Sequence, residues 1–204
     1  MEVYKYTTIS GATTAEFKDR GSKFLAYAYP VALLQDVKDK VQLLKKEHPK
    51  AVHYCLAFRM GTDGNQFRAS DDGEPAGSAG KPILGQIDSA ELTNVLVVVV
   101  RYFGGTLLGV PGLINAYKTV TADALAAVGR VEKWIEHKVE ISFDYPAMGE
   151  VLNLLKHSEA TIYKQELQLF CLVVAGIPIK HSETCLGKLS EIRGVTIKNL
   201  KDTE

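Results

Sequence analysis

The segment NVLVVVVRYF (94–103) is the most apolar part of the chain and contains four consecutive valines. β-Branched residues favour extended structure, and a strand that is apolar at both odd and even positions is typical of one buried on both faces of a sheet. We therefore predict that this segment is a central strand with packing on both sides. A glycine loop, GGTLLGVPG (104–112), follows it, and the pattern predicts a helix over 113–129 that ends at Gly129.

The residues before this strand alternate between β-prone and helical patterns. The predicted elements are a strand in 2–9, two strands within 13–31 around Arg20-Gly21-Ser22, a helix in 33–49, strands in 53–60 and 65–70, and a helix in 81–93. In KFLAYAY (23–29) the bulky Tyr27 and Tyr29 alternate with alanines, as they do in a strand.

The segment 130–138 is predicted to be a linker or the start of the next domain, and the residues after it have a regular order. A strand in 138–145, a helix in 146–160, strands in 161–168 and 169–179, a helix in 181–194 and a strand in 195–201 give the βαββαβ order of a ferredoxin-like domain. We therefore predict an α+β protein with domains at 1–132 and 133–204. Trp134, in the linker, is expected to pack the two domains together.

The composition excludes several classes of protein. In the 204 residues, 46% are hydrophobic and 24% charged, which is ordinary for a globular chain. No apolar run approaches the roughly 20 residues of a membrane-spanning helix, and the start, MEVYKYTTIS, does not resemble a secretory signal. Cys55, Cys171 and Cys185 are odd in number and far apart, so we expect reduced thiols, a cytoplasmic protein and no disulfide-linked partner.

The charge is balanced, with 24 basic and 24 acidic residues. Residues 1–130 carry 15 basic and 13 acidic residues, and residues 131–204 carry 9 and 11. Neither half has the strongly basic character of a protein that coats nucleic acid without regard to sequence. A local basic patch remains compatible with these numbers.

The stretch ASDDGEPAGSAGKP (69–82) places Asp71, Asp72 and Glu74 close together. It is not a P-loop, because Pro75 stands where the first glycine is needed and Pro82 where a Ser or Thr should follow the lysine. The alternating acidic positions of an EF-hand are also absent, and we predict no metal site. The alternative is that an aspartate accepts hydrogen bonds from turn amides while Glu74 neutralises a helix start or a basic group.

Two arrangements suggest nucleophilic chemistry. Ser78 lies in Gly77-Ser78-Ala79-Gly80, which does not match G-x-S-x-G. His53 and Cys55 are two residues apart on a predicted strand and would point to the same side, although a cysteine on an apolar strand is more often buried filler.

A set of basic residues is attached to the ends of rigid elements. Arg68, Lys81, Arg101 and Lys118, together with His53, indicate either a preorganised polar site or a network of salt bridges. The glycine loop at Gly104 and Gly105 has two interpretations as well. A strand followed by a glycine turn and a helix start can bind an anion, or the glycines serve tight packing.

Three long motifs in a fixed order resemble the YigZ/IMPACT family of cytoplasmic proteins. They are HYCLAF (53–58), SDDGEPAGSAGKPIL (70–84) and VVVVRYFGGTLLGVPGLINAY (97–117), and GSKF (21–24) also fits. The motif residues are His53, Arg68, Asp71, Asp72, Glu74, Gly77, Gly80, Lys81, Pro82, Arg101, Tyr102, Phe103, Gly104 and Gly105. The chain departs from the family pattern at Pro111 and Asn115, where the family usually has a glycine and an arginine.

The resemblance implies a fold and a role for each domain. It implies a ribosomal-protein domain-2-like α/β sandwich at the N-terminus and a C-terminal domain similar to the last domain of elongation factor G. It also implies a protein without catalysis or cofactor that binds RNA or a ribosome-associated partner and regulates translation. On this interpretation Arg68, Lys81, Arg101 and Lys118 contact phosphate, and Tyr102 or Phe103 offers a stacking face.

Two other hypotheses fit the same residues. One is a hydrolase of a phosphorylated substrate, with His53, Asp71, Asp72 and Glu74 as catalytic residues, acting with or without Mg²⁺. The other is structural, in which the acidic turn pairs with Arg101 or Lys81 and fastens the edge of the sheet to the glycine loop.

Overall fold

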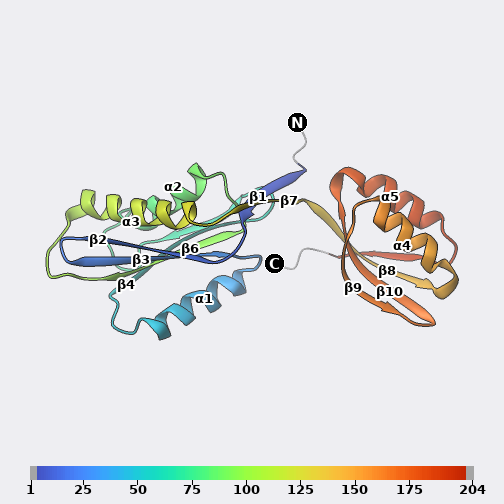
Figure 1. The fold of residues 1–204 in the computed structure, drawn as a ribbon, viewed down its shortest axis with the longest axis horizontal. Helices are drawn as coiled ribbons and strands as arrows, with labels where there is room; N and C mark the ends of the chain where they lie inside the picture. The colour runs from blue at the N-terminus through green and yellow to red at the C-terminus, as the bar shows by residue number, and fades with distance from the viewer. Residues whose placement is uncertain (1–3, 201–204) are drawn as a thin grey trace. The chain divides into compact units, whose positions relative to one another are not determined.

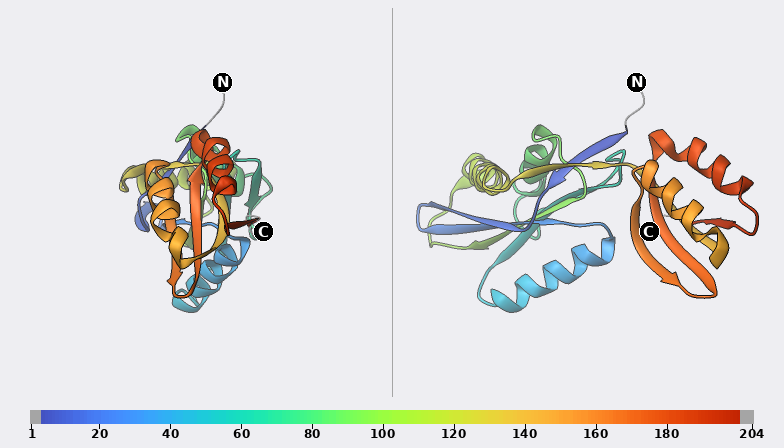
Figure 2. Two further views of the ribbon diagram at one scale, coloured as in Figure 1. Left: turned by 90° about the vertical axis from the view of Figure 1, so that its right-hand side faces the viewer. Right: turned by 45° about the vertical axis from the view of Figure 1, so that its right-hand side comes forward.

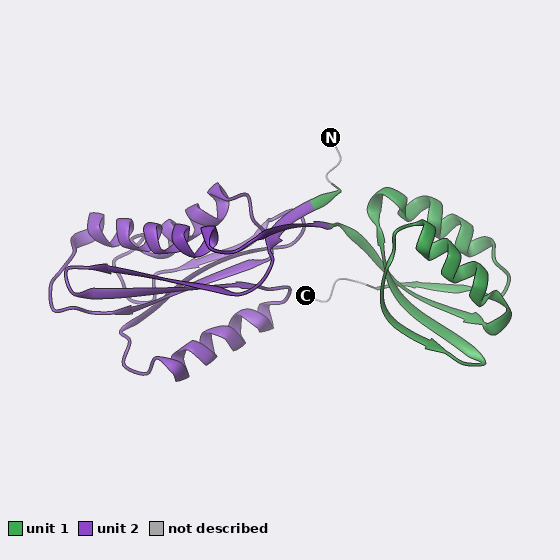
Figure 3. Cartoon of the chain, in the orientation of Figure 1, with its two compact units in different colours: residues 1–5, 134–204 green, residues 6–133 purple. Residues whose placement is uncertain are grey.

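The structure, a computed structural model, describes residues 4–200 and divides the chain into two compact units (Figure 3). The N-terminal unit comprises Tyr6–Lys133. The C-terminal unit comprises residues 134–200 together with residues 4 and 5. Each unit is described separately below.

The N-terminal unit is built on a five-stranded antiparallel sheet with the strand order β2-β3-β6-β4-β5. Its strands are β2 (Thr13–Asp19), β3 (Ser22–Pro30), β4 (His53–Met60), β5 (Gln66–Ser70) and β6 (Val95–Tyr102). The segment 94–103 therefore supplies the central strand, as predicted. Two further strands, β1 (Lys5–Ile9) and β7 (Arg130–Trp134), form a separate two-stranded sheet.

Helices cover both faces of the five-stranded sheet (Figure 1). α2 (Gly80–Ser89) and α3 (Gly109–Ala126) lie on one face, and α1 (Leu34–Glu47) lies on the other. Val95, Val97 and Val99 of β6 belong to the core under α2 and α3, whereas Leu96, Val98 and Val100 belong to the core under α1. This two-sided packing explains why β6 is apolar at every position and confirms that it is buried on both faces.

Two boundaries of the N-terminal unit were predicted wrongly. The helix expected from residue 113 begins at Gly109, so half of the predicted glycine loop is helical. Pro111 does not prevent this, because it lies in the first turn, where backbone N–H groups have no helical acceptor. The segment 130–138, predicted as a linker or as the start of the next domain, contains β7 and the first residues of the next strand, and its backbone groups are paired in sheets.

The C-terminal unit has the predicted order of elements. β8 (Glu136–Asp144), a 3₁₀ turn η1 (Tyr145–Ala147), α4 (Met148–His157), β9 (Thr161–Leu167), β10 (Phe170–Pro178), α5 (Ile179–Glu191) and β11 (Thr196–Asn199) follow one another. The strands form one antiparallel sheet with the order β11-β8-β10-β9, and α4 and α5 cover one face of it. Both units therefore mix helices with antiparallel sheets, as expected of the α+β class.

The C-terminal unit has its own hydrophobic core and also holds Trp134. Ile141 and Val173 of the sheet pack with Leu155 of α4 and Leu189 of α5. The Trp134 ring lies 4.5 Å from Lys5 Nζ and 3.9 Å from Lys180 Nζ, and both lysines belong to this unit. These two contacts of Trp134 are cation–π contacts within one unit, whereas Trp134 was expected from the sequence to pack the two domains together.

Two predictions from composition can be compared with the structure. Among the described residues, no helix is long and apolar enough to cross a membrane. Cys55, Cys171 and Cys185 are buried free thiols.

Candidate functional site

The acidic turn that follows β5 is organised around the Asp71 carboxylate. Its Oδ2 accepts a hydrogen bond from Gly77 N at 2.8 Å, and its Oδ1 accepts from Ala79 N at 3.0 Å and Gly80 N at 2.8 Å. These amides lead into α2, whose first N–H groups have no acceptor within the helix. One carboxylate therefore closes the turn and caps the helix, which was one of the two interpretations drawn from the sequence.

The environment of Asp71 keeps it ionised. Partial burial acts to raise the pKa of its carboxyl group, but the three backbone N–H donors and the charge of Lys81 outweigh burial and hold the pKa below its usual value. The negative charge is thus stabilised by the fold itself.

Asp72 connects the turn to the first residues of β4. Its Oδ2 accepts a hydrogen bond from Tyr54 N at 2.7 Å, and its backbone carbonyl oxygen lies 2.8 Å from His53 Nδ1. Asp72 has a φ of 44° and is followed by Gly73 with a φ of 88°, so the turn uses two left-handed residues. This conformation brings His53 and Asp72 together as the sequence suggested, but both are engaged in fastening the turn.

Glu74 forms a buried ion pair with Arg101 of β6. Its Oε1 lies 2.5 Å from Arg101 Nη1, and the two side chains are 3% and 6% exposed. The hydroxyl of Tyr117, on α3, donates a hydrogen bond to the same oxygen at 2.8 Å, and His53 Nε2 lies 4.0 Å away. One carboxylate therefore joins the turn, the central strand and α3.

The Arg101 guanidinium is enclosed by aromatic rings and a hydroxyl. It lies 5.3 Å from the centre of the Phe24 ring and 5.7 Å from that of Phe103. Its Nη2 is 3.5 Å from Ser22 Oγ, which also accepts a hydrogen bond from Gly104 N at 3.2 Å. Arg101 is thus a buried connector between the turn and the glycine loop, and its guanidinium is withdrawn from the surface where a phosphate would arrive.

Cys55 and Tyr117 extend this buried network. Cys55 Sγ lies 3.3 Å from Tyr117 Oη and 2.9 Å from the Asp71 carbonyl oxygen. Burial raises the pKa of the Cys55 thiol and the pKa of the Tyr117 hydroxyl well above their usual values. Cys55 is therefore a protonated thiol, not the thiolate that the suggested Cys–His nucleophile would require.

The glycine loop is held by a close approach of two backbone segments. A Cβ atom on Gly104 would collide with the backbone of Gly21 and Ser22. Gly105 has a φ of 85° with open space around it. Of the two interpretations drawn from the sequence, tight packing accounts for Gly104, whose N–H is already bonded to Ser22.

The predicted basic residues do not converge on one surface. Arg68 pairs across the sheet with Phe58, and Tyr102 pairs with Lys23, so both point to the face covered by α1. Arg101 points to the opposite face, because neighbouring residues of a strand alternate. Lys81 and Lys118 are exposed on α2 and α3.

The carboxylates of the acidic turn are all bonded to groups of the protein. Asp71 is bonded to backbone amides, Asp72 to Tyr54 N, and Glu74 to Arg101 and Tyr117. Within residues 4–200, no group of three or more His, Cys, Asp and Glu residues is arranged to hold a metal ion. Nothing in this arrangement supports the hydrolase hypothesis, whereas the paired, buried cluster is what the structural hypothesis describes.

A second polar cluster, under α1, was missed by the sequence analysis. His48 Nε2 lies 2.7 Å from Tyr27 Oη, and His48 Nδ1 lies 2.9 Å from Tyr102 Oη. Tyr54 Oη donates a hydrogen bond to the His48 carbonyl oxygen at 2.5 Å. The alternation of Tyr27 with alanines was a usable signal, because it placed the tyrosine on one face of its strand.

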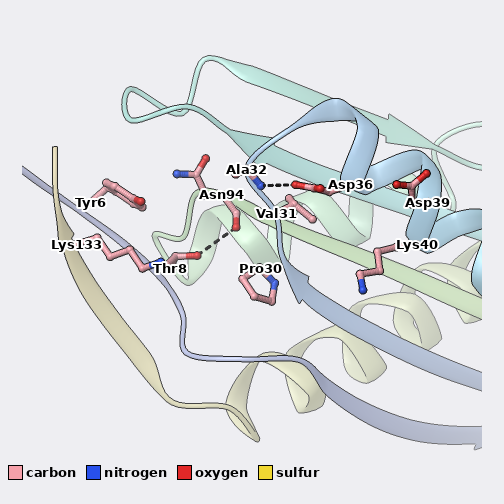
Figure 4. Close-up of a pocket in the computed structure, with 10 residues that line it drawn as sticks. All are labelled: Tyr6, Thr8, Pro30, Val31, Ala32, Asp36, Asp39, Lys40, Asn94 and Lys133. Carbon is pink, nitrogen blue, oxygen red and sulfur yellow. Dashed lines mark hydrogen bonds between the residues drawn. The ribbon is translucent and has the colours of Figure 1, made fainter. Parts of the chain in front are cut away.

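A pocket of about 410 Å³ opens beside the start of α1 (Figure 4). Its wall includes Pro30 and Val31 at the end of β3, Asp36 and Lys40 of α1, and Lys133 of β7. Asp36 Oδ2 accepts hydrogen bonds from Ala32 N and Leu33 N, and this fixes the start of the helix.

Comparison with known proteins identifies the family. Residues 20–125 match the IMPACT N-terminal domain. An IMPACT family member from Haemophilus influenzae is 34% identical over 189 residues, which cover 92% of this chain and 92% of that protein. The chain belongs to the IMPACT family. Its IMPACT domain lies within the N-terminal unit and contains Glu74, Arg101 and Tyr117.

Two solved structures are also similar to this IMPACT family chain. One, described as a hypothetical protein, superposes with a TM-score of 0.75 and is 27% identical, covering 99% of this chain and 100% of that one. The other is the two-domain translational regulator Yih1, which is 30% identical over 63% of this chain and 49% of its own, with a TM-score of 0.36. The relation to Yih1 is therefore one of sequence.

Proposed function

We propose that this IMPACT family protein is a non-catalytic cytoplasmic protein that binds RNA or a ribosome-associated partner and regulates translation. The observation that carries the proposal is that the acids and the thiol of the family motifs are engaged with the fold. Asp71, Glu74 and Cys55 bond to backbone amides, to Arg101 and to Tyr117, and this favours a binding scaffold over a catalytic site. A role in translation is supported by family membership, because the relative Yih1 is described as a translational regulator.

We also propose the finer fold assignments and domain limits. The strand order β11-β8-β10-β9 supports a ferredoxin-like C-terminal domain similar to the last domain of elongation factor G. The N-terminal sheet, with helices on both faces, is proposed as the ribosomal-protein domain-2-like fold. The proposed domains are 1–132 and 133–204, close to the division between Lys133 and Trp134.

The proposed contact residues are exposed or partly exposed residues of the N-terminal unit. Arg68, Lys81 and Lys118 are exposed cations, and Gly105 is exposed in the glycine loop. Tyr102 is partly exposed, and Phe103 is 49% exposed beside the buried Arg101. The buried Arg101 and the exposed Gly104 hold the loop in place.

Binding to ribosomes and to total RNA, measured as a function of salt concentration, tests the proposal. Contacts to phosphate release counterions, so we expect affinity to fall as salt rises, by roughly 0.7 in log–log slope for each phosphate neutralised on a single strand. The double variant Lys81→Ala/Lys118→Ala reports on the exposed motif residues without removing half of a buried ion pair, as Arg101→Ala would. Absence of binding to both ribosomes and RNA at low salt would exclude the proposed function.

A further inference from the structure

The face of the N-terminal sheet that carries α1 presents four tyrosines. Tyr27 and Tyr29 of β3, Tyr54 of β4 and Tyr102 of β6 all pack against the core under α1, and all four are only partly buried. Within residues 6–133, all of which the structure describes, α1 is the only helix on this side (Figures 1 and 2). All four tyrosines therefore stay partly in contact with solvent, although α1 covers this face.

Three of these four tyrosines are held in place by hydrogen bonds before any partner arrives. Tyr27 and Tyr102 share His48, which lies 2.7 Å and 2.9 Å from their hydroxyls, and Tyr54 is bonded to the His48 carbonyl. Side chains that are already ordered lose little conformational entropy when a ligand stacks on them. The arrangement therefore suits a surface that receives flat, unstacked rings.

Cations stand next to these rings. Lys40 Nζ lies 4.9 Å from the centre of the Tyr29 ring, and Lys45 Nζ lies 5.5 Å from that of Tyr54. A strand of nucleic acid offers phosphates and bases side by side, so an ammonium group beside an aromatic ring matches both parts of a nucleotide.

The two sides of the N-terminal unit differ in charge. The α1 side consists of the strand positions facing α1, the helix itself and the turn after it, and it carries eight cations and four anions. The cations are Lys18, Lys23, Lys38, Lys40, Lys45, Lys46, Lys50 and Arg68, and the anions are Glu16, Asp36, Asp39 and Glu47. The other side consists of the opposite strand positions, α2, α3 and the acidic turn, and it carries four cations and six anions. The cations are Arg59, Lys81, Arg101 and Lys118, and the anions are Asp19, Asp71, Asp72, Glu74, Asp88 and Asp123. The α1 side thus attracts a polyanion more strongly than the side that carries the acidic turn.

We infer that single-stranded RNA binds across the α1 face, with bases stacked on the tyrosines and phosphates on the lysines of α1. The inference rests on the proposed function and adds to it a site for single-stranded RNA on the face opposite the acidic turn, where the proposed contact residues Arg68 and Tyr102 also lie. A single strand fits better than a duplex, because a duplex keeps its bases stacked inside and offers only its backbone.

Fluorescence anisotropy with a labelled 15-nucleotide oligouridine probes this surface. Tyr29 is the best position, because its described contact is the Lys40 ammonium and its removal leaves the His48 bonds intact. Tyr29→Leu is expected to weaken binding by roughly 5- to 100-fold, the range for loss of one stacked base. Tyr29→Phe keeps the ring and should bind like the wild type.

Three further variants complete the experiment. Lys45→Gln should weaken binding and reduce the salt slope by roughly 0.7. Lys156→Gln and Tyr145→Leu, at an exposed lysine and an exposed tyrosine of the C-terminal unit, should bind like the wild type. Melting temperatures measured in parallel identify any variant whose fold has changed.

The possible outcomes separate this inference from the proposed function. Loss of binding in Lys81→Ala/Lys118→Ala, with binding by Tyr29→Leu unchanged, would overturn the inference that RNA binds the α1 face and would leave the proposed function standing. Binding to ribosomes without binding to oligouridine would do the same. If an RNA duplex bound as tightly as oligouridine, or polyglutamate competed as effectively as RNA, and Tyr29→Leu bound like the wild type, the stacking of bases on the tyrosines would be overturned. If neither ribosomes nor RNA bind, both proposals fail.

Discussion

Glu74 and Arg101 show how the location of a charge decides what it can do. A charged pair withdrawn from water must be satisfied by its own surroundings, and removing one partner leaves the other uncompensated, at a cost of about 3–5 kcal/mol. Here Tyr117 bonds the carboxylate, while Phe24 and Phe103 flank the guanidinium. Arg101 is therefore committed to the fold, whereas the exposed Lys81 remains available to a ligand.

Asp71 gives a prediction at the scale of one titrating group. Its folded-state pKa lies below the ordinary value of 3.8, so the stabilisation it provides is complete above that value and is lost as the pH falls through the lowered pKa. Asp71→Asn should lower the free energy of unfolding at pH 7 by about 1–3 kcal/mol, because a charged acceptor of three amides is replaced by a neutral one. Urea unfolding at pH 7 and at pH 2.5 measures the difference, which should shrink in acid.

Asp123→Asn serves as the control for this experiment, since Asp123 is exposed on α3. It should change the free energy of unfolding by less than about 0.5 kcal/mol at either pH. An equal loss for Asp71→Asn at both pH values would mean that the charge of Asp71 is not what stabilises the turn.

The glycine loop gives a prediction at the scale of one element. Gly104→Ala should destabilise the N-terminal unit by about 3 kcal/mol, because the new Cβ meets the backbone of Gly21 and Ser22 and neither segment can rotate away. Gly85→Ala in α2 is the matched control, because a Cβ there meets nothing within 4 Å. It should stabilise the helix by about 0.5–1 kcal/mol. Thermal unfolding distinguishes them, and a neutral Gly104→Ala would contradict the packing role.

The elements were more predictable than the site. The βαββαβ order and the doubly buried β6 follow from hydrophobic periodicity, which is a local property of the chain. The start of α3 was placed too late because Gly109 and Pro111 normally indicate a loop, although the first turn of a helix accepts both. β7 was missed because its partner, β1, is more than 120 residues away in sequence.

The sequence named candidate residues for the site but could not assign them to the two faces of the sheet. One of the hypotheses paired the acidic turn with Arg101 or Lys81, and in the structure Glu74 pairs with Arg101. Arg68 and Tyr102, however, belong to the other face. Alternation along β6 already separates Arg101 from Tyr102. The face of Arg68 depends on its register with Phe58, and that is set by the sheet as a whole.

At the scale of the molecule, the separate cores predict separate unfolding transitions. Trp134 is the only tryptophan and belongs to the C-terminal unit, so its fluorescence reports on that unit. Leu155→Ala removes a buried side chain of the same unit and should cost about 2–5 kcal/mol in the fluorescence transition. Ile83→Ala, in the N-terminal core, should leave that transition unchanged while circular dichroism detects its effect. Coincident shifts in both variants would show that the units unfold together.

The balanced composition conceals an uneven molecule. A net charge of zero argued against a protein that binds nucleic acid along its whole surface, and that argument still holds for the average. Averages over the chain cannot detect that eight cations gather around α1, because the assignment depends on which way each strand residue points.

The reactivity of the three buried cysteines can report how often the surrounding structure opens. Cys55 is inaccessible in the N-terminal unit, and Cys171 and Cys185 are inaccessible in the C-terminal unit. A thiol reagent such as Ellman's can therefore modify each of them only when the surrounding structure opens, and the yellow product counts those openings over time. Since Cys55 lies against the carbonyl of Asp71, its modification times the release of the acidic turn, and no label has to be introduced.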